Sequence, residues 1–185
     1  MKKTVFVIAI VMFLMGVQLN AQKYITKAGS IEIFSQTPIF TIEGINKKVA
    51  SILNLETGDL VVTTLIRSFK FHEALVEDHF NENYLESEKF PKASFKGKIP
   101  NFQDIDVKKN GDYKVAVKGD LTIHGTTIPI EQQATITVKD GKISGKTIFN
   151  VSLAKYKIKV EENYKDAIKD EIKLNVRFDY DLSAK

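Results

Sequence analysis

Three histidines, His72, His79 and His124, are the side chains of this sequence best suited to metal binding or acid–base catalysis. His79 and Glu82 are three residues apart, a spacing that would place both on one helix face as a pair of metal ligands. The spacing supplies no third ligand, and the His-Glu-x-x-His pattern is absent. No nucleophile-elbow pattern occurs either. We therefore predict no catalytic residue, no metal site and no enzymatic activity, and we expect structural hydrogen bonds for the three histidines.

The composition excludes several classes of chemistry. The chain has 185 residues and no cysteine, which excludes disulfides, thiolate metal sites, thiol catalysis and a lipidated N-terminal cysteine. The formal net charge is +4, and two of those charges belong to Lys2 and Lys3. Without them the surface is close to balanced, so we predict no nucleic-acid partner.

The N-terminus is typical of a secretory signal peptide. Lys2 and Lys3 precede an apolar stretch over residues 5–17, and Ala21 offers a small residue at the cleavage point. We expect residues 1–21 to be removed and the protein to be periplasmic or secreted; an uncleaved membrane anchor is the alternative. Residues 22–185 show no linker or composition break, which favours one domain.

Residues 113–138 carry the clearest structural signal. Apolar and polar side chains alternate with a period of two on both sides of a turn predicted at Gly125-Thr126-Thr127. Each arm has about 12 residues and would be roughly 40 Å long, about twice the usual strand. Asp140-Gly141 then predicts a type I′ turn into the next strand.

The remaining elements are mostly strands as well. The predicted strands cover residues 30–36, 46–55, 59–71, 92–99, 142–151 and 171–182, and a helical segment covers 72–84. About eight antiparallel strands without a βαβ rhythm indicate an all-β barrel or sandwich, and we favour the barrel because closure removes sheet edges. The charged stretch 155–173 predicts a solvated edge, with a membrane-surface or partner contact near the barrel mouth as the alternative.

Two segments resemble the YceI-like family. The first is Gly119-Asp120-Leu121-Thr122-Ile123-His124-Gly125 with Thr127 and Pro129 behind it; the second covers residues 79–87 and 90–95. Glu77 and Ile128 depart from the family pattern and are typical of a divergent branch. The resemblance implies an elongated eight-stranded antiparallel barrel with one short helix, similar to the lipocalins. It also implies a non-enzymatic carrier of isoprenoid quinones or other long amphiphiles.

The apolar phase of the strands supplies the candidate ligand-binding residues. A barrel of this size is either filled by side chains or holds one slim ligand. The predicted cavity wall comprises Phe95, Val115, Val117, Gly119, Leu121, Ile123, Gln132, Ile136, Phe149 and Phe178.

Gly119 and Gln132 each have a second interpretation. A glycine on the inward phase either leaves room for a ligand or permits sharp coiling of the strand. Gln132 interrupts the apolar phase: either a bulge turns its amide outward, or the amide contacts a ligand head group or an ordered water.

The expected partner is a long-chain amphiphilic lipid, with isoprenoid quinone first and polyisoprenoid or fatty-acid-like lipid next, bound for transport or storage rather than as a cofactor. Each buried methylene contributes about 0.8 kcal/mol, so apolar burial specifies length and girth rather than chemistry. A filled barrel that acts as an envelope stress or protein-interaction module is the alternative. The sequence carries no indication of an oligomeric state.

Overall fold

The computed structural model describes residues 23–181, which consist mainly of antiparallel strands. The strands are β1 (Lys23–Gln36), β2 (Thr41–Asn54), β3 (Asp59–Leu65), β4 (Lys70–Phe71), β5 (Lys92–Lys98), β6 (Gly111–Ile123), β7 (Thr126–Lys139), β8 (Lys142–Ser152) and β9 (Glu171–Asp181). The helix α2 (Ala74–His79) continues as a π-helical turn over Phe80–Tyr84. Short 3₁₀ turns lie at Ile66–Ser68, Phe102–Asp104 and Glu162–Tyr164. Within this described part of the chain, no helix is both long enough and apolar enough to cross a membrane.

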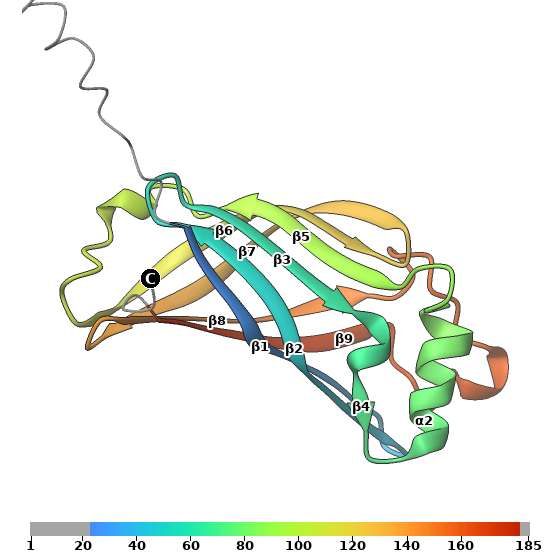
Figure 1. Cartoon of the computed structure of the whole chain (residues 1–185). Coiled ribbons are helices and arrows are strands. Elements are labelled where there is room, and N and C mark those ends of the chain that lie inside the picture. Colours follow the sequence, from blue (N-terminus) through green and yellow to red (C-terminus); the bar gives the residue numbers. More distant parts are fainter. Residues whose placement is uncertain (1–22, 182–185) are drawn as a thin grey trace, which may run out of the picture.

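The strands form one sheet that closes into a barrel (Figure 1). The order is β1-β9-β8-β7-β6-β5-β3-β2-β4, and β1 also pairs with β2, which closes the ring. Each pairing between neighbouring strands is antiparallel. Eight strands make the wall, while β4 adds only two residues beside β2. The predicted eight-stranded antiparallel barrel with one short helix is therefore confirmed.

The tall hairpin predicted over residues 113–138 is formed by β6 and β7, whose arms have 13 and 14 residues. Its turn was predicted one residue too late, because Thr126 already pairs with Ile123. The two turn residues are His124 (φ 49°) and Gly125 (φ 69°). Positive φ at both positions gives the twist that suits a two-residue hairpin loop. The second predicted turn, at Asp140 and Gly141, is confirmed with φ of 50° and 74°.

Several strand boundaries differ from the predictions. β1 begins at Lys23, well before residue 30, and its pairing with β2 shifts register on both sides of Gly29. These irregularities disturb the local alternation of side chains, which hides the first half of the strand from a period-two pattern. The strand predicted over 59–71 ends at Leu65, because the 3₁₀ turn at Ile66–Ser68 separates it from β4.

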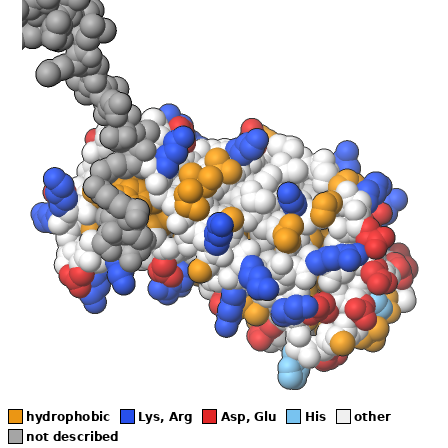
Figure 2. Space-filling model, in the orientation of Figure 1, with side chains coloured by type: hydrophobic (Ala, Val, Ile, Leu, Met, Phe, Trp, Pro, Cys, Tyr) orange, Lys and Arg blue, Asp and Glu red, His pale blue; other side chains and the backbone are white. Residues whose placement is uncertain are grey.

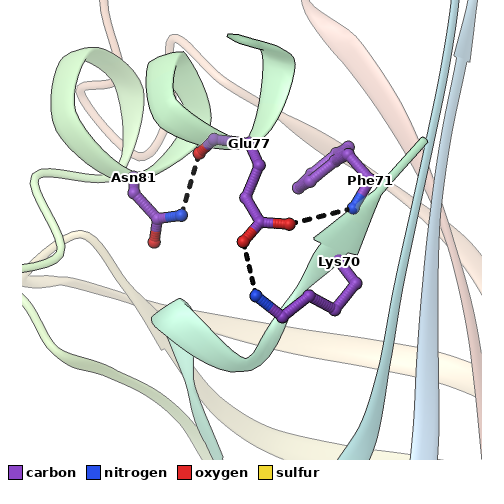
Figure 3. A network of polar contacts seen from close by, with 4 residues as sticks. All are labelled: Lys70, Phe71, Glu77 and Asn81. Carbon is purple, nitrogen blue, oxygen red and sulfur yellow. Dashed lines mark hydrogen bonds and ion pairs between the residues drawn. The ribbon is translucent and has the colours of Figure 1, made fainter. Parts of the chain in front are cut away.

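Helix α2 is tied to β4 by the side chain of Glu77 (Figure 3). Its carboxylate accepts hydrogen bonds from Lys70 Nζ at 2.5 Å and from the Phe71 backbone N–H at 3.3 Å. The hydrogen bond from Lys70 lowers the pKa of Glu77. Asn81 Nδ2 donates to the Glu77 carbonyl oxygen at 2.8 Å, one turn further along. The helix is thereby attached at one end of the barrel rather than to its outer wall.

Residues 153–170, which we call the end loop, cross the same end of the barrel beside α2 (Figure 1). The base of the loop is closed by hydrogen bonds from the Leu153 and Ala154 N–H groups to Asp170, at 2.9 and 2.7 Å. Tyr156 and Ile158 are buried, although lysines surround them in the sequence. Most of the charged stretch is therefore a loop packed over the barrel end, and its last residues, 171–173, begin β9, which pairs with β8 and β1 and is not an edge of the sheet.

Side chains fill the opposite half of the barrel, toward the Asp140–Gly141 turn. The fully buried members include Leu53, Phe102, Val138 and Ile143. A second core cluster lies toward α2 and the end loop and includes Phe95, Leu121 and Tyr156 among others. The interior space is found between these two clusters and at the α2 end.

Candidate ligand-binding site

The interior of the barrel contains two neighbouring cavities. The inner cavity has a volume of about 130 Å³ and the outer cavity, at the α2 end, about 380 Å³. The outer volume is in the range of pockets that hold a single small molecule. Five residues from five different strands line both cavities: Ile31, Thr64, Ala93, Leu121 and Leu174. The two cavities therefore lie end to end along the barrel, as a long ligand would require.

The inner cavity brings together most of the predicted wall. Seven of the ten predicted residues line it: Phe95, Val117, Leu121, Gln132, Ile136, Phe149 and Phe178. They come from β5, β6, β7, β8 and β9, so the period-two pattern of each strand directs them to the same interior. Ile123 lines the outer cavity instead, and Leu121 lines both.

Two predicted residues lie elsewhere. Val115 packs against the core cluster in the filled half of the barrel. Gly119 pairs with Gly97 across β5 and β6, and a Cβ atom there would lie 2.4 Å from Gly97 Cα and from the Lys96 carbonyl oxygen. The Phe95 ring covers both glycines. Close approach of the two strands, and not room for a ligand, therefore explains Gly119, which we remove from the candidate wall.

Gln132 faces the inner cavity. The pairing of β6 with β7 runs without a register shift from Gly111 to Ile123, so no bulge turns the Gln132 amide outward. Thr147, which also lines this cavity, donates its hydroxyl hydrogen to the Gln133 carbonyl oxygen at 2.8 Å and is satisfied within the sheet. Gln132 is therefore the candidate polar contact in a mostly apolar compartment.

The barrel wall divides between β7 and β8. These strands pair only from Ala134 and Thr147 toward their turn; beyond this point β7 pairs with β6 and β8 pairs with β9. Apolar residues of the end loop and of the separated strands pack together in the second core cluster: Ile128, Ile130, Val151, Leu153, Tyr156 and Ile158. The end loop thus contributes to the wall where the two strands part.

The outer cavity is lined by aromatic and apolar residues that the strand pattern did not identify. These are Phe69, Phe71, Phe80, Tyr84, Tyr156, Ile158, Tyr164 and Ile168, from the segments around α2 and from the end loop. Leu75 on α2 also lines the cavity and is 64% exposed, so the cavity reaches the surface beside the helix. A signal was present in the sequence, because Tyr156, Ile158 and Val160 alternate with lysines.

The lining of the outer cavity includes the phenols Tyr156, which is buried, and Tyr84, which is half-buried. Burial raises the pKa of Tyr156, whose Oη has no hydrogen-bond partner among the described residues. Burial also raises the pKa of Tyr84, and the negative charge of Glu161 adds to this effect. Both side chains therefore stay neutral hydroxyl groups at physiological pH.

His124 holds three loops together at this end of the barrel. Its Nε2 lies 2.6 Å from Glu86 Oε2, its Nδ1 lies 3.3 Å from the Tyr156 carbonyl oxygen, and its ring packs edge-on against Phe90 at 4.5 Å. Both oxygens can only accept, so both contacts become hydrogen bonds only when each ring nitrogen carries a hydrogen. The structural role expected for His124 agrees with these contacts.

The other histidines have separate surroundings. His79 lines the outer cavity and packs against Tyr164, with ring centroids 5.7 Å apart, while His72 is exposed. Within residues 23–181, no three His, Asp or Glu side chains gather closely enough to hold a metal ion. The predicted signal peptide, residues 1–21, lies outside the described residues.

Solved structures with the same architecture come from several bacteria. A polyisoprenoid binding domain from Saccharophagus degradans is 12% identical, with a TM-score of 0.75 over 86% of this chain and 98% of its own. BcnA from Burkholderia cenocepacia is 16% identical, with a TM-score of 0.67 over 82% and 95%. A YCEI protein from Campylobacter jejuni is 20% identical, with a TM-score of 0.59 over 78% and 87%.

At these identities the likeness concerns the fold alone. Comparison of the sequence with curated proteins finds no match. The model of the YceI-like domain, by contrast, matches residues 23–180, which is nearly all of the barrel. The chain therefore belongs to the YceI-like domain family.

Proposed function

We propose that this protein binds a long apolar ligand inside its barrel and transports or stores it without changing it chemically. The observation that carries the proposal is the pair of apolar cavities placed end to end, with five residues common to both walls. An elongated, mostly apolar space fits a chain-like molecule better than a compact polar one. The polyisoprenoid binding domain that shares the fold supports the same ligand class.

The energetics of chain burial are sufficient for such a role. An isoprene unit of five carbons contributes roughly 3–4 kcal/mol at about 0.8 kcal/mol per buried carbon. Binding costs several kcal/mol in lost freedom of the ligand and the wall. A few units therefore suffice for micromolar affinity. Isoprenoid quinones, polyisoprenoids and fatty-acid-like lipids all supply chains of this kind.

The filled-barrel alternative has less support. Side chains do fill the half of the interior that contains Phe102 and Val138. The other half keeps a cavity of about 380 Å³, which a purely structural barrel would not need. We also propose a periplasmic or secreted location, from the signal-peptide pattern of residues 1–21.

The direct test is to purify the protein without detergent, extract it with organic solvent and identify the released lipids by mass spectrometry. We expect one long-chain lipid class at close to one molecule per protein. Re-extraction after incubation with that lipid should return it unchanged. No lipid in the extract, together with no uptake of added lipid, would remove the proposal. Recovery of a chemically altered lipid would contradict the non-enzymatic role.

A further inference from the structure

The outer surface of the barrel carries a row of apolar side chains across β1, β2 and β3. Ile25 on β1 lies directly opposite Ile52 on β2, and Ile52 lies opposite Val61 on β3. Ile25 is 63% exposed and Ile52 is 40% exposed, while Val61 is half-buried. Because neighbouring strands lie about 4.8 Å apart, the three side chains form a continuous row. Leu65, further along β3, is 49% exposed and extends the apolar surface.

Lysines surround this row on β1, β2, β3 and β5. Six of them are exposed: Lys23, Lys27, Lys48, Lys92, Lys96 and Lys98. Among residues 23–181, none of the six contacts a carboxylate. β3 and β5 together contribute one acidic residue, Asp59, and β6 places Asp120 opposite Lys96. Positive charge therefore predominates on this surface, and we call the apolar row with its six lysines the basic face.

Other parts of the outer surface have paired or acidic charges. Lys118 on β6 contacts Glu131 on β7 at 3.0 Å, and Arg177 contacts Asp179 within β9 at 3.3 Å. Figure 2 shows hydrophobic side chains between Lys and Arg side chains along the barrel wall, with acidic side chains gathered mainly at the α2 end. The combination of an exposed apolar row with unpaired lysines is typical of an interaction surface.

The type of basic residue indicates the kind of partner. Interfaces between proteins are enriched in arginine and depleted in lysine, because the planar guanidinium binds carboxylates in a fixed geometry. The four strands of the basic face contain no arginine. Lysine has a flexible apolar stem and a compact, hydrated charge. It can therefore follow mobile phosphate groups while its stem lies along apolar side chains, as at a membrane surface.

We propose that the basic face docks on a lipid surface with anionic head groups. The side chains of Ile25 and Ile52 enter the boundary between head groups and acyl chains, and the surrounding lysines contact lipid phosphates. In this orientation the barrel lies on its side on the lipid surface. The proposal concerns the outer wall alone and does not depend on what the barrel contains.

Flotation with lipid vesicles tests the docking. The mature protein is mixed with vesicles of phosphatidylcholine alone and with vesicles in which about 30% of the lipid is phosphatidylglycerol. We expect binding to the anionic vesicles to be at least about tenfold tighter, and to be largely lost in about 0.5 M salt, which screens the lysine charges. Absence of binding to both kinds of vesicle, or equal binding to both, would overturn the proposal.

Two double variants test the contribution of the lysines. Lys48→Gln combined with Lys96→Gln should weaken binding to the anionic vesicles by about 20-fold, because each lysine near such a surface contributes about fivefold. Lys139→Gln combined with Lys142→Gln removes the same charge at the turn between β7 and β8, across the barrel. This control should change binding by less than about twofold. Equal losses in the two double variants would overturn the assignment of the basic face.

The apolar row is tested with Ile52→Ser, which should weaken vesicle binding about threefold. Ile148→Ser is the matched control, because Ile148 is 52% exposed on β8, across the barrel, and should not affect binding. Equal effects of the two variants would overturn the contribution of the row. Self-association of the lipid-free protein that Ile52→Ser abolishes, measured by analytical ultracentrifugation, would assign the face to a second copy of the chain and overturn docking on lipid.

Discussion

Tyr180 illustrates how a single buried polar group can set the response of this fold to pH. In the filled half of the barrel, the Tyr180 and Ser51 hydroxyls share a hydrogen bond of 2.5 Å. Burial raises the pKa of Tyr180 to about 12, from an ordinary value of 10.0. The unfolded chain therefore releases this proton at lower pH than the folded barrel does, and ionisation favours unfolding.

We expect the contribution of Tyr180 to be fully present below pH 10 and to be lost as pH rises from 10 toward 12. The slope should approach about 1.4 kcal/mol per pH unit within that window. Urea unfolding of the wild type and of Tyr180→Phe between pH 7 and 12 measures the difference, because other titrating groups are common to both proteins. An equal decline in the two proteins would show that folding does not raise the pKa of Tyr180.

Gly119 and Gly145 differ in the space that the structure leaves for a side chain. A Cβ at Gly119 would collide with backbone atoms of β5, whereas a Cβ at Gly145 would meet Ile136 Cδ1 at an ordinary 3.5 Å. We expect Gly119→Ala to lower the free energy of unfolding by about 1–3 kcal/mol and Gly145→Ala to change it by less than about 1 kcal/mol. Similar stabilities of the two variants in denaturant titrations would contradict the close approach of the strands.

At the scale of elements, the end loop and the β6–β7 turn are coupled through His124. Its contacts with Glu86 and with the Tyr156 carbonyl connect the segment after α2, the turn and the end loop. These segments have few regular backbone hydrogen bonds of their own. Side-chain contacts therefore determine the local stability of the loops that close the end of the cavity.

Removal of the His124 ring should loosen the end loop while leaving the barrel intact. In His124→Asn the shorter side chain still tolerates the positive φ of this turn but reaches neither partner. We expect amide exchange of residues 153–170 to increase about tenfold, corresponding to a loss of about 1.4 kcal/mol of local stability. Asp140→Asn, in the turn at the opposite end, is the control and should leave exchange in the end loop unchanged. Unaltered exchange in His124→Asn would show that the ring does not hold the loop.

At the scale of the whole molecule, much of the barrel could be predicted because alternation along a strand is a local property. Val117, Leu121 and Ile136 were assigned to the interior from their phase alone, and all three line the inner cavity. The Asp140–Gly141 turn was predicted from two residues whose conformational preferences are equally local.

The parts that could not be predicted depend on contacts between distant segments. Gly119 lies on the inward phase, but the proximity of Gly97 follows from the pairing of β5 with β6. The direction of the Gln132 side chain could be determined only from the register of the whole β6–β7 hairpin. Tyr156 alternates with lysines in the sequence, but that its side chain turns toward the cavity follows from the way the irregular end loop packs over the barrel end. The strand pattern therefore predicted the residues of the barrel wall better than those of the end loop.

The proposed function places a chain-like ligand in the passage where both cavities meet. Ala93 lines both cavities, while Ala116 on β6 lies on the outward phase, so Ala93→Phe and Ala116→Phe add the same ring inside and outside the barrel. Both variants must first unfold cooperatively, which shows that the barrel is intact. The measurement is the amount of long-chain lipid extracted per molecule of detergent-free protein. We predict about tenfold less lipid in Ala93→Phe than in the wild type and in Ala116→Phe, because the ring fills the shared passage. Equal lipid content in all three proteins would contradict binding of the ligand in this passage.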